Sequence, residues 1–181
     1  MGASTGGPSH IKKILNALPL NFDACIIIAQ HMADTYIETF ASHMDKTSNI
    51  KVKVAKDTQR LENSSVYITS HLCKISNNSN TYSFNITDSK TNAYNPDINE
   101  LFLSCAELNT KLNILACILT GIGADGAKGM AKLSTIDALC IAESEESAVV
   151  YGMPKRAKEL CSNVQVKSLD EIIKTIIEFG A

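Results

Sequence analysis

The sequence carries no excess of basic residues, no membrane-length hydrophobic run and no secretion signal. Its 181 residues include 17 Lys and Arg against 19 Asp and Glu, so the formal net charge of -2 lacks the basic footprint of a nucleic-acid-binding protein. The longest near-apolar run, residues 114–124, falls well short of the roughly 20 residues that span a membrane. No basic segment followed by an apolar stretch and a cleavage site opens the chain. These absences argue against nucleic-acid binding, membrane insertion and export, and they predict a cytoplasmic protein.

The cysteines also lack the spacing of a disulfide framework or a metal site. Six are scattered along the chain, and four of them lie inside apolar runs. Cysteines in such runs are typical of small core residues in a reducing compartment. We therefore expect neither a disulfide nor a metal site from Cys25, Cys73, Cys105, Cys117, Cys140 and Cys161.

Apolar runs alternate with amphipathic segments along most of the chain. Continuous apolar runs are typical of strands buried on both faces of a parallel sheet, and helical spacing of apolar residues marks the segments between them. The pattern predicts one compact α/β domain over residues 1–181, in three layers, with a mainly parallel, doubly wound sheet and helices on both faces. The expected strands cover residues 24–29, 114–119, 138–142 and 164–166, and the expected helices cover 8–17, 34–44, 97–111, 127–133 and 154–160.

Two expected helices carry start signals in the sequence. Asp34 is expected to be an N-cap, because its carboxylate can accept a hydrogen bond from an unpaired amide of the first turn. Ser168 and Glu171 have the spacing of a capping box and predict the start of a final helix.

The middle of the chain predicts shorter strands. Apolar and polar residues alternate within residues 52–54 and 82–86, and residues 66–68 form a short apolar run. Such patterns are typical of half-exposed, antiparallel strands. Residues 76–80, rich in Ser and Asn, are expected to form the tip of a hairpin. We therefore predict a short antiparallel section here rather than a domain linker.

The first residues of the chain contain the candidate nucleophile, Ser4. Residues 2–6, GASTG, match the pattern G-x-S-x-G, in which a serine sits on a sharp turn from a strand into a helix. Glycine suits such a turn because it tolerates a positive φ. Pro8 predicts the first turn of the helix, which places Ser4 near free amides at the positive end of a helix dipole. Taken alone, the motif also fits a phosphate-binding turn or a turn without a chemical role.

Two further candidates follow predicted strands. His31 follows strand 24–29, and Asp125 lies in the loop after strand 114–119. Loops at the carboxyl ends of parallel strands converge on one crevice, so we expect Ser4, His31 and Asp125 to meet there. Imidazole can take the serine proton, and a carboxylate fixes its tautomer. Taken alone, His31 also fits a surface or capping residue and Asp125 a turn former. The other histidines are interpreted as structural: His10, His43 and His71.

Four motifs, in this order, resemble the catalytic domain of the chemotaxis protein-glutamate methylesterases, the CheB family. They are GASTGGP at residues 2–8, QHM at 30–32, LTGIGADGA at 119–127 and VVYGMP at 149–154. The resemblance covers nearly the whole chain and places the family's serine, histidine and aspartate on Ser4, His31 and Asp125. It implies hydrolysis of glutamate γ-methyl esters on the cytoplasmic domains of methyl-accepting chemoreceptors, with release of methanol, and deamidation of receptor glutamines.

The mechanism that the resemblance implies also needs donors for the oxyanion, and we offer a hypothesis for them. Backbone amides at Thr5, Gly6 or Ile122 are expected to hold the oxyanion that forms during attack. No metal or organic cofactor is implied, and a monomer is expected.

The sequence departs from the family pattern at several places. It lacks the apolar strand that precedes the serine turn in family members, which predicts loss of the central strand and a loosened Ser4. It contains no receiver domain, so we expect that control to be absent from this chain. Ile122 stands where methionine is common, Asn95 where arginine is, and Glu143 where glutamine is. The last two are expected to affect substrate binding.

Two other functions are compatible with the sequence. A binding module with this fold would dock on receptors without catalysing hydrolysis. A nucleotide-binding α/β domain would use residues 2–7 as its phosphate loop, but the chain lacks both a Walker lysine and a G-x-G-x-x-G fingerprint.

Overall fold

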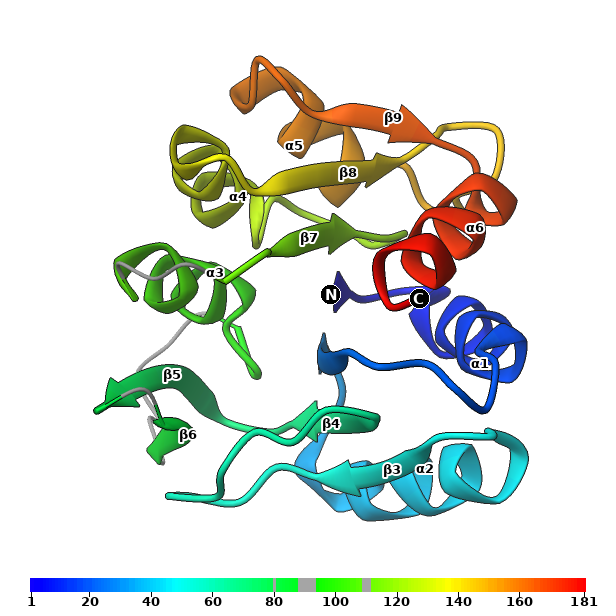
Figure 1. The fold of residues 1–181 in the computed structure, drawn as a ribbon. Helices are drawn as coiled ribbons and strands as arrows, with labels where there is room; N and C mark the ends of the chain where they lie inside the picture. Colours follow the sequence, from blue (N-terminus) through cyan, green and yellow to red (C-terminus); the bar gives the residue numbers. More distant parts are fainter. Residues whose placement is uncertain (80, 88–93, 109–111) are drawn as a thin grey trace.

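A seven-stranded parallel sheet forms the centre of the protein. The computed structural model describes residues 1–79, 81–87, 94–108 and 112–181. The strands lie in the order β3-β4-β2-β1-β7-β8-β9, and their pairings are all parallel. They comprise β1 (Gly2–Ala3), β2 (Cys25–Gln30), β3 (Lys51–Val54), β4 (Ser65–Thr69), β7 (Leu115–Ile118), β8 (Leu139–Glu143) and β9 (Gln165–Lys167). The first strand is therefore central, and the later strands extend the sheet on both sides of it (Figure 1).

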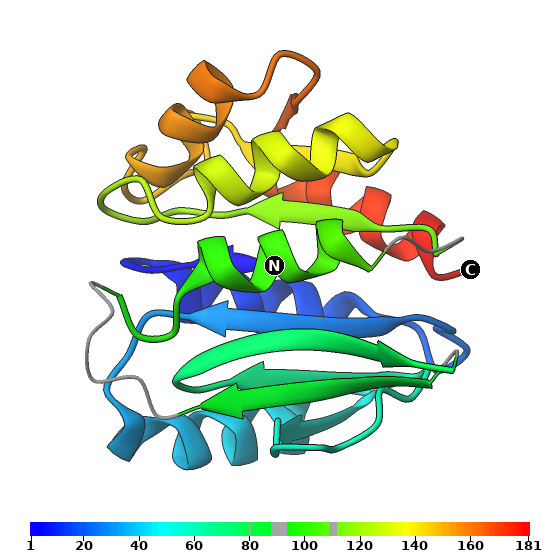
Figure 2. The ribbon, with the colours of Figure 1, turned by 90° about the vertical axis from the view of Figure 1, so that its left-hand side faces the viewer.

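Helices cover both faces of the sheet (Figures 1 and 2). One face packs against α1 (Gly7–Ala17), α2 (Asp34–Thr47) and α6 (Leu169–Phe179). The other packs against α3 (Ile98–Glu107), α4 (Ala127–Leu133) and α5 (Met153–Leu160), and a short 3₁₀ turn, η1 (Ser134–Ile136), follows α4. The buried apolar residues form two clusters, one beneath each helical layer. The predicted three-layer, doubly wound α/β fold is confirmed.

The predicted antiparallel section is smaller than expected. It consists of the hairpin β5 (Leu72–Asn78) and β6 (Thr81–Thr87), which packs near α3. Asn80, in the predicted tip, lies outside the described residues. The expectation that residues 52–54 and 66–68 are antiparallel is wrong, because β3 and β4 are parallel strands of the main sheet. β4 is also buried along its length, whereas β3 is partly exposed, as expected.

Helix starts agree with the sequence at α6 but not at α2. The capping box of Ser168 and Glu171 is present at α6. Asp34, by contrast, is the first residue of α2, and the N-cap position falls on Ala33 without a side-chain cap. The Asp34 carboxylate instead accepts a hydrogen bond from the Asn95 amide, with a distance of 3.2 Å. The third helix ends at Glu107, and Lys111, the predicted end, lies outside the described residues.

The central strand is shortened but present, which corrects the expectation that it is lost. Its two residues pair with β2 on one side and with β7 on the other. The Met1 carbonyl accepts from the Ala29 N–H at 2.9 Å, and the Gly2 carbonyl accepts from the Leu119 N–H at 2.9 Å. A cavity of about 440 Å³ lies beside Met1, where Cys25 and Leu115 are among its lining residues. The strand is short, yet backbone hydrogen bonds on both sides hold the residues that lead into Ser4.

Candidate active site

The Ser4 turn is held by hydrogen bonds from three directions. The Ser4 N–H donates to the Thr120 carbonyl at 3.0 Å, and the Ser4 carbonyl accepts from the Gly7 N–H at 2.8 Å. The same carbonyl accepts from the side-chain amide of Gln30 at 3.0 Å. Gly6 has a φ of 84°, a conformation that glycine adopts without strain. Ser4 therefore lies on a fixed, half-buried turn between β1 and α1.

The predicted histidine and aspartate contact each other directly. The distance between Nε2 of His31 and Oδ2 of Asp125 is 2.8 Å. The Asp125 side chain is 0% exposed and that of His31 is 14% exposed. Because a carboxylate only accepts hydrogen bonds, Nε2 carries a hydrogen. Nδ1 of a neutral His31 is then the nitrogen available as a base.

Asp125 is anchored by three backbone amides in addition to His31. Its Oδ2 accepts from the Ile98 N–H at 2.9 Å, and its Oδ1 accepts from the N–H groups of Asn99 at 3.0 Å and Gly126 at 2.8 Å. The first two amides belong to the first turn of α3, where unpaired amides favour a negative charge. A buried carboxylate with four donors is both well satisfied and fixed in orientation.

Ser4 and His31 follow neighbouring strands at the same level. Ala3 pairs with Gln30, and the His31 N–H donates to the Ala3 carbonyl at 2.9 Å. Within the described part of the chain, however, the Ser4 hydroxyl forms no hydrogen bond with the His31 ring. Catalytic hydrogen bonds are often long in unliganded enzymes and shorten when substrate binds. The structure thus joins His31 to Asp125 and brings the backbones of Ser4 and His31 side by side.

The expected oxyanion donors border the same turn. Among the described residues, the N–H groups of Thr5, Gly6 and Ile122 donate to no protein acceptor. The loop carrying Ile122 lies against Ser4, since a Cβ added to Gly121 would lie 2.7 Å from the Ser4 Cβ. Backbone amides from two loops therefore border Ser4 and remain available to a ligand.

Sequence reasoning missed Tyr94, which stacks on His31. The two ring centroids are 5.2 Å apart and the rings are almost parallel, with an angle of 3°. The next residue, Asn95, is held by Asp34 at the start of α2. No spacing rule pointed to Tyr94, because the contact depends on how the segment before α3 crosses the end of β2.

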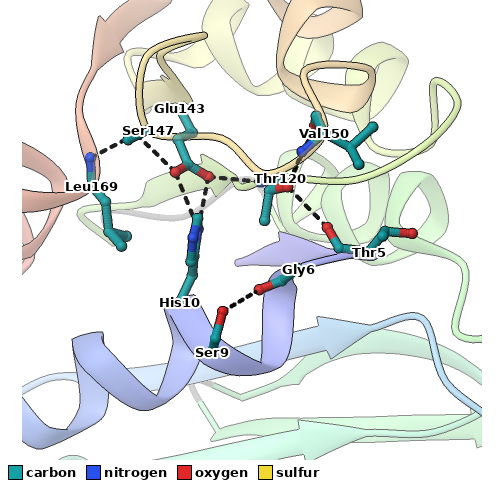
Figure 3. Close-up of polar contacts among 9 residues, drawn as sticks. All are labelled: Thr5, Gly6, Ser9, His10, Thr120, Glu143, Ser147, Val150 and Leu169. Carbon is teal, nitrogen blue, oxygen red and sulfur yellow. Dashed lines mark hydrogen bonds and ion pairs between the residues drawn. The ribbon is translucent and has the colours of Figure 1, made fainter.

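Glu143 lies elsewhere than expected for a residue that binds substrate. Its side chain is 0% exposed at the end of β8, and it contacts Nδ1 of His10 at 3.1 Å. It also accepts from the Thr120 N–H at 2.8 Å. A fully buried Glu143 does not contact a substrate directly, and the expected effect on substrate binding stays a prediction. Glu143 belongs to a buried cluster with His10 and Thr120 that lies beside Thr5 and Gly6 (Figure 3).

Among the described residues, no three His, Cys, Asp or Glu side chains are grouped so that they could bind a metal ion. None of the helices in the described ranges has the length and hydropathy needed to cross a membrane.

The fold is that of a doubly wound α/β domain with its candidate site at the point where the strand order reverses, the usual ligand position in such sheets. The family model described as CheB methylesterase matches residues 1–176. The chain belongs to the CheB methylesterase family.

Individual relatives agree with this assignment. The chain is 37% identical over 164 residues to a protein named protein-glutamate methylesterase/protein-glutamine glutaminase from Caldanaerobacter subterraneus, covering 88% of this chain and 45% of the relative. A relative of the same name from Archaeoglobus fulgidus is 32% identical, with coverage of 99% and 52%. The chain thus spans about half the length of these curated relatives. The crystal structure of the Thermotoga maritima CheB methylesterase catalytic domain superposes with a TM-score of 0.89 at 33% identity, covering 98% of this chain and 95% of that one.

Proposed function

We propose that this domain hydrolyses γ-methyl esters of glutamate on the cytoplasmic domains of chemoreceptors, with Ser4 as nucleophile, His31 as base and Asp125 as the residue that orients His31. The observation that carries the proposal is the contact between Nε2 of His31 and Oδ2 of Asp125, buried beside the Ser4 turn. The names of the relatives supply the substrate class. The chemoreceptors come from the resemblance to the CheB family, and because their substrate domains are cytoplasmic, we propose that the protein acts in the cytoplasm.

The reaction follows from the positions of these groups. The Ser4 hydroxyl attacks the γ-carbonyl carbon and transfers its proton to Nδ1 of His31. Asp125 accepts the hydrogen bond from Nε2 and stabilises the imidazolium. The N–H groups of Thr5 and Ile122 bind the oxyanion, and each such donor contributes roughly 10²–10³ in rate.

The second half of the reaction regenerates the enzyme. The imidazolium gives its proton to the departing methoxide, so methanol leaves and an acyl ester with Ser4 remains. Water then attacks that ester, its proton passes to His31, and the glutamate carboxyl group is released with a free Ser4 hydroxyl. A glutamine side chain follows the same course with ammonia as the leaving group. We propose this as a second activity, by analogy with the names of the relatives.

The test is methanol release from purified, methylated receptor cytoplasmic domain. The native protein is expected to release methanol with multiple turnovers, and Ser4→Ala is expected to release none above the background rate. Both proteins should show the same circular dichroism spectrum and melting temperature. Equal release by the two proteins would refute the esterase proposal. Receptor binding without release by the folded native protein would favour the alternative, a binding module.

A further inference from the structure

His10, Glu143 and Thr120 form a buried polar cluster that lies beside Thr5 and Gly6, the residues that follow Ser4 (Figure 3). Nδ1 of His10, in α1, lies within 3.2 Å of both carboxylate oxygens of Glu143. Glu143 also accepts hydrogen bonds of 2.8 Å from the Thr120 N–H and from the Ser147 hydroxyl. Ser147 is itself held by the Leu169 N–H at the start of α6. The carboxylate is thus fully buried, and its partners His10, Thr120 and Ser147 come from three separate segments of the chain.

Thr120 connects this cluster to the backbone on both sides of Ser4. Its carbonyl accepts from the Ser4 N–H at 3.0 Å, and its hydroxyl donates to the Thr5 carbonyl at 2.9 Å. The hydroxyl also accepts from the Val150 N–H at 2.8 Å. With its own N–H bound to Glu143, every polar group of Thr120 has a partner. Thr120 therefore holds the backbone at the Ser4 N–H and at the Thr5 carbonyl. The peptide group between Ser4 and Thr5, which carries the Thr5 N–H, lies between these two points.

We propose that Thr120, held by Glu143 and His10, is the positioning residue that sets the Ser4 hydroxyl and the Thr5 N–H for hydrolysis; this inference rests on the proposed function. A buried carboxylate costs free energy unless its hydrogen bonds are complete, so the cluster has one low-energy arrangement. Because Thr120 is bonded both to Glu143 and to the backbone of Ser4 and Thr5, this arrangement fixes the position of the turn. A nucleophile or oxyanion donor that is misplaced by about 1 Å loses roughly 10²-fold in rate.

The chain offers a matched control for the loss of a buried threonine hydroxyl. Thr69, at the end of β4, is fully buried and donates to the Ile28 carbonyl at 3.3 Å. Neither Thr69 nor Ile28 contacts the Ser4 turn through a hydrogen bond in the described structure. Thr69→Val therefore removes a buried hydroxyl without touching the proposed linkage.

The first comparison uses Thr120→Val, Thr120→Ser and Thr69→Val. Thr120→Val keeps the shape of the side chain but removes the bonds to the Thr5 carbonyl and the Val150 N–H. We expect kcat for methanol release to fall roughly 10- to 100-fold while KM changes by less than about twofold. Thr120→Ser keeps the hydroxyl and should retain kcat within about threefold. Thr69→Val should lower the melting temperature about as much as Thr120→Val does but leave kcat unchanged.

The second comparison uses Glu143→Gln and Glu143→Leu. In Glu143→Gln, the amide oxygen still accepts from the Thr120 N–H, and the amide nitrogen donates to Nδ1 of His10 in its other tautomer. We expect this variant to retain kcat within about threefold. Glu143→Leu leaves the Thr120 N–H and His10 without an acceptor and should lower kcat as Thr120→Val does. A role in stability alone would not produce rescue of kcat by glutamine.

All rates are measured per folded molecule, at a temperature where each variant is folded by circular dichroism. Labelling of Ser4 by a fluorophosphonate is measured in parallel, because it reports the reactivity of the serine without a receptor. Unchanged kcat and labelling rate in Thr120→Val, or equal losses in Thr69→Val, would overturn the inference. A native protein that is labelled at Ser4 but releases no methanol would refute the substrate assignment, and the labelling rates of the variants would then decide the positioning role. A native protein that does neither would refute both.

Discussion

Replacing Asp125 by asparagine tests how one buried carboxylate serves both stability and catalysis. The carboxylate accepts from four donors: Oδ2 from His31 and the Ile98 N–H, and Oδ1 from the N–H groups of Asn99 and Gly126. An asparagine side chain offers one oxygen, so its NH₂ group must face one of these two pairs.

The two orientations of the amide differ in cost. With the NH₂ at the Oδ1 position, two buried N–H groups lose their acceptor, at about 1–3 kcal/mol each. With the NH₂ at the Oδ2 position, His31 can accept by changing tautomer, and only the Ile98 N–H is left unpaired. The second orientation is therefore favoured, at a cost of about 1–3 kcal/mol in the free energy of unfolding. It moves the His31 hydrogen to Nδ1, where the base is needed.

Asp125→Asn is accordingly expected to be folded, moderately destabilised and almost inactive. The wrong histidine tautomer lowers kcat roughly 10⁴-fold in a serine, histidine and aspartate triad. Urea unfolding measures the stability, and methanol release measures the activity. Asp97→Asn is the control, because Asp97 caps α3 by accepting from the Glu100 N–H and asparagine caps equally well. A folded Asp125→Asn protein with more than about a tenth of native kcat would refute this reasoning.

Two further predictions concern stability. Gly6→Ala places a side chain at a φ of 84° and a Cβ 2.7 Å from the Cβ of Val149. We therefore expect the free energy of unfolding, measured in urea, to fall by about 2–5 kcal/mol and kcat to fall with it. A change in the free energy of unfolding below about 0.5 kcal/mol would contradict this. Burial raises the pKa of the Cys73 and Cys117 thiols to about 12. Above about pH 9 the unfolded state, with thiol pKa values near 9, therefore loses these protons while the folded state keeps them. The free energy of unfolding should then fall as the pH rises, by up to about 1.4 kcal/mol per thiol per pH unit. Urea unfolding between pH 7 and 10 measures the fall, and Cys73→Ala should reduce its slope; an equal slope in both proteins would contradict the assignment.

The sequence was sufficient to predict the architecture wherever burial is complete on both faces of a strand. Continuous apolar runs gave β2, β7 and β8, and the order of strands and helices gave the three layers. The assignment failed at β4, because its polar end residues Ser65 and Thr69 are buried within the sheet. Thr69 meets its hydrogen-bonding need through the Ile28 carbonyl of the neighbouring strand, which no local pattern reveals.

The candidate site was predictable to the extent that strand ends converge. Strand assignment placed Ser4, His31 and Asp125 at one edge of the sheet, and the structure joins the last two. The three amides that hold Asp125 come partly from α3, and the ring that covers His31 is that of Tyr94. These contacts depend on the docking of distant segments, so neither spacing nor periodicity predicts them.

The most direct test of the account is to identify the residue that reacts with a fluorophosphonate. The account predicts one covalent adduct, located by mass spectrometry on Ser4, absent in Ser4→Ala and at least about 10³-fold slower to form in His31→Ala, because the hydroxyl then lacks its base. A folded native protein that forms no adduct, forms it on another serine, or reacts equally fast without His31 would contradict the central claim that Ser4, His31 and Asp125 act as one unit.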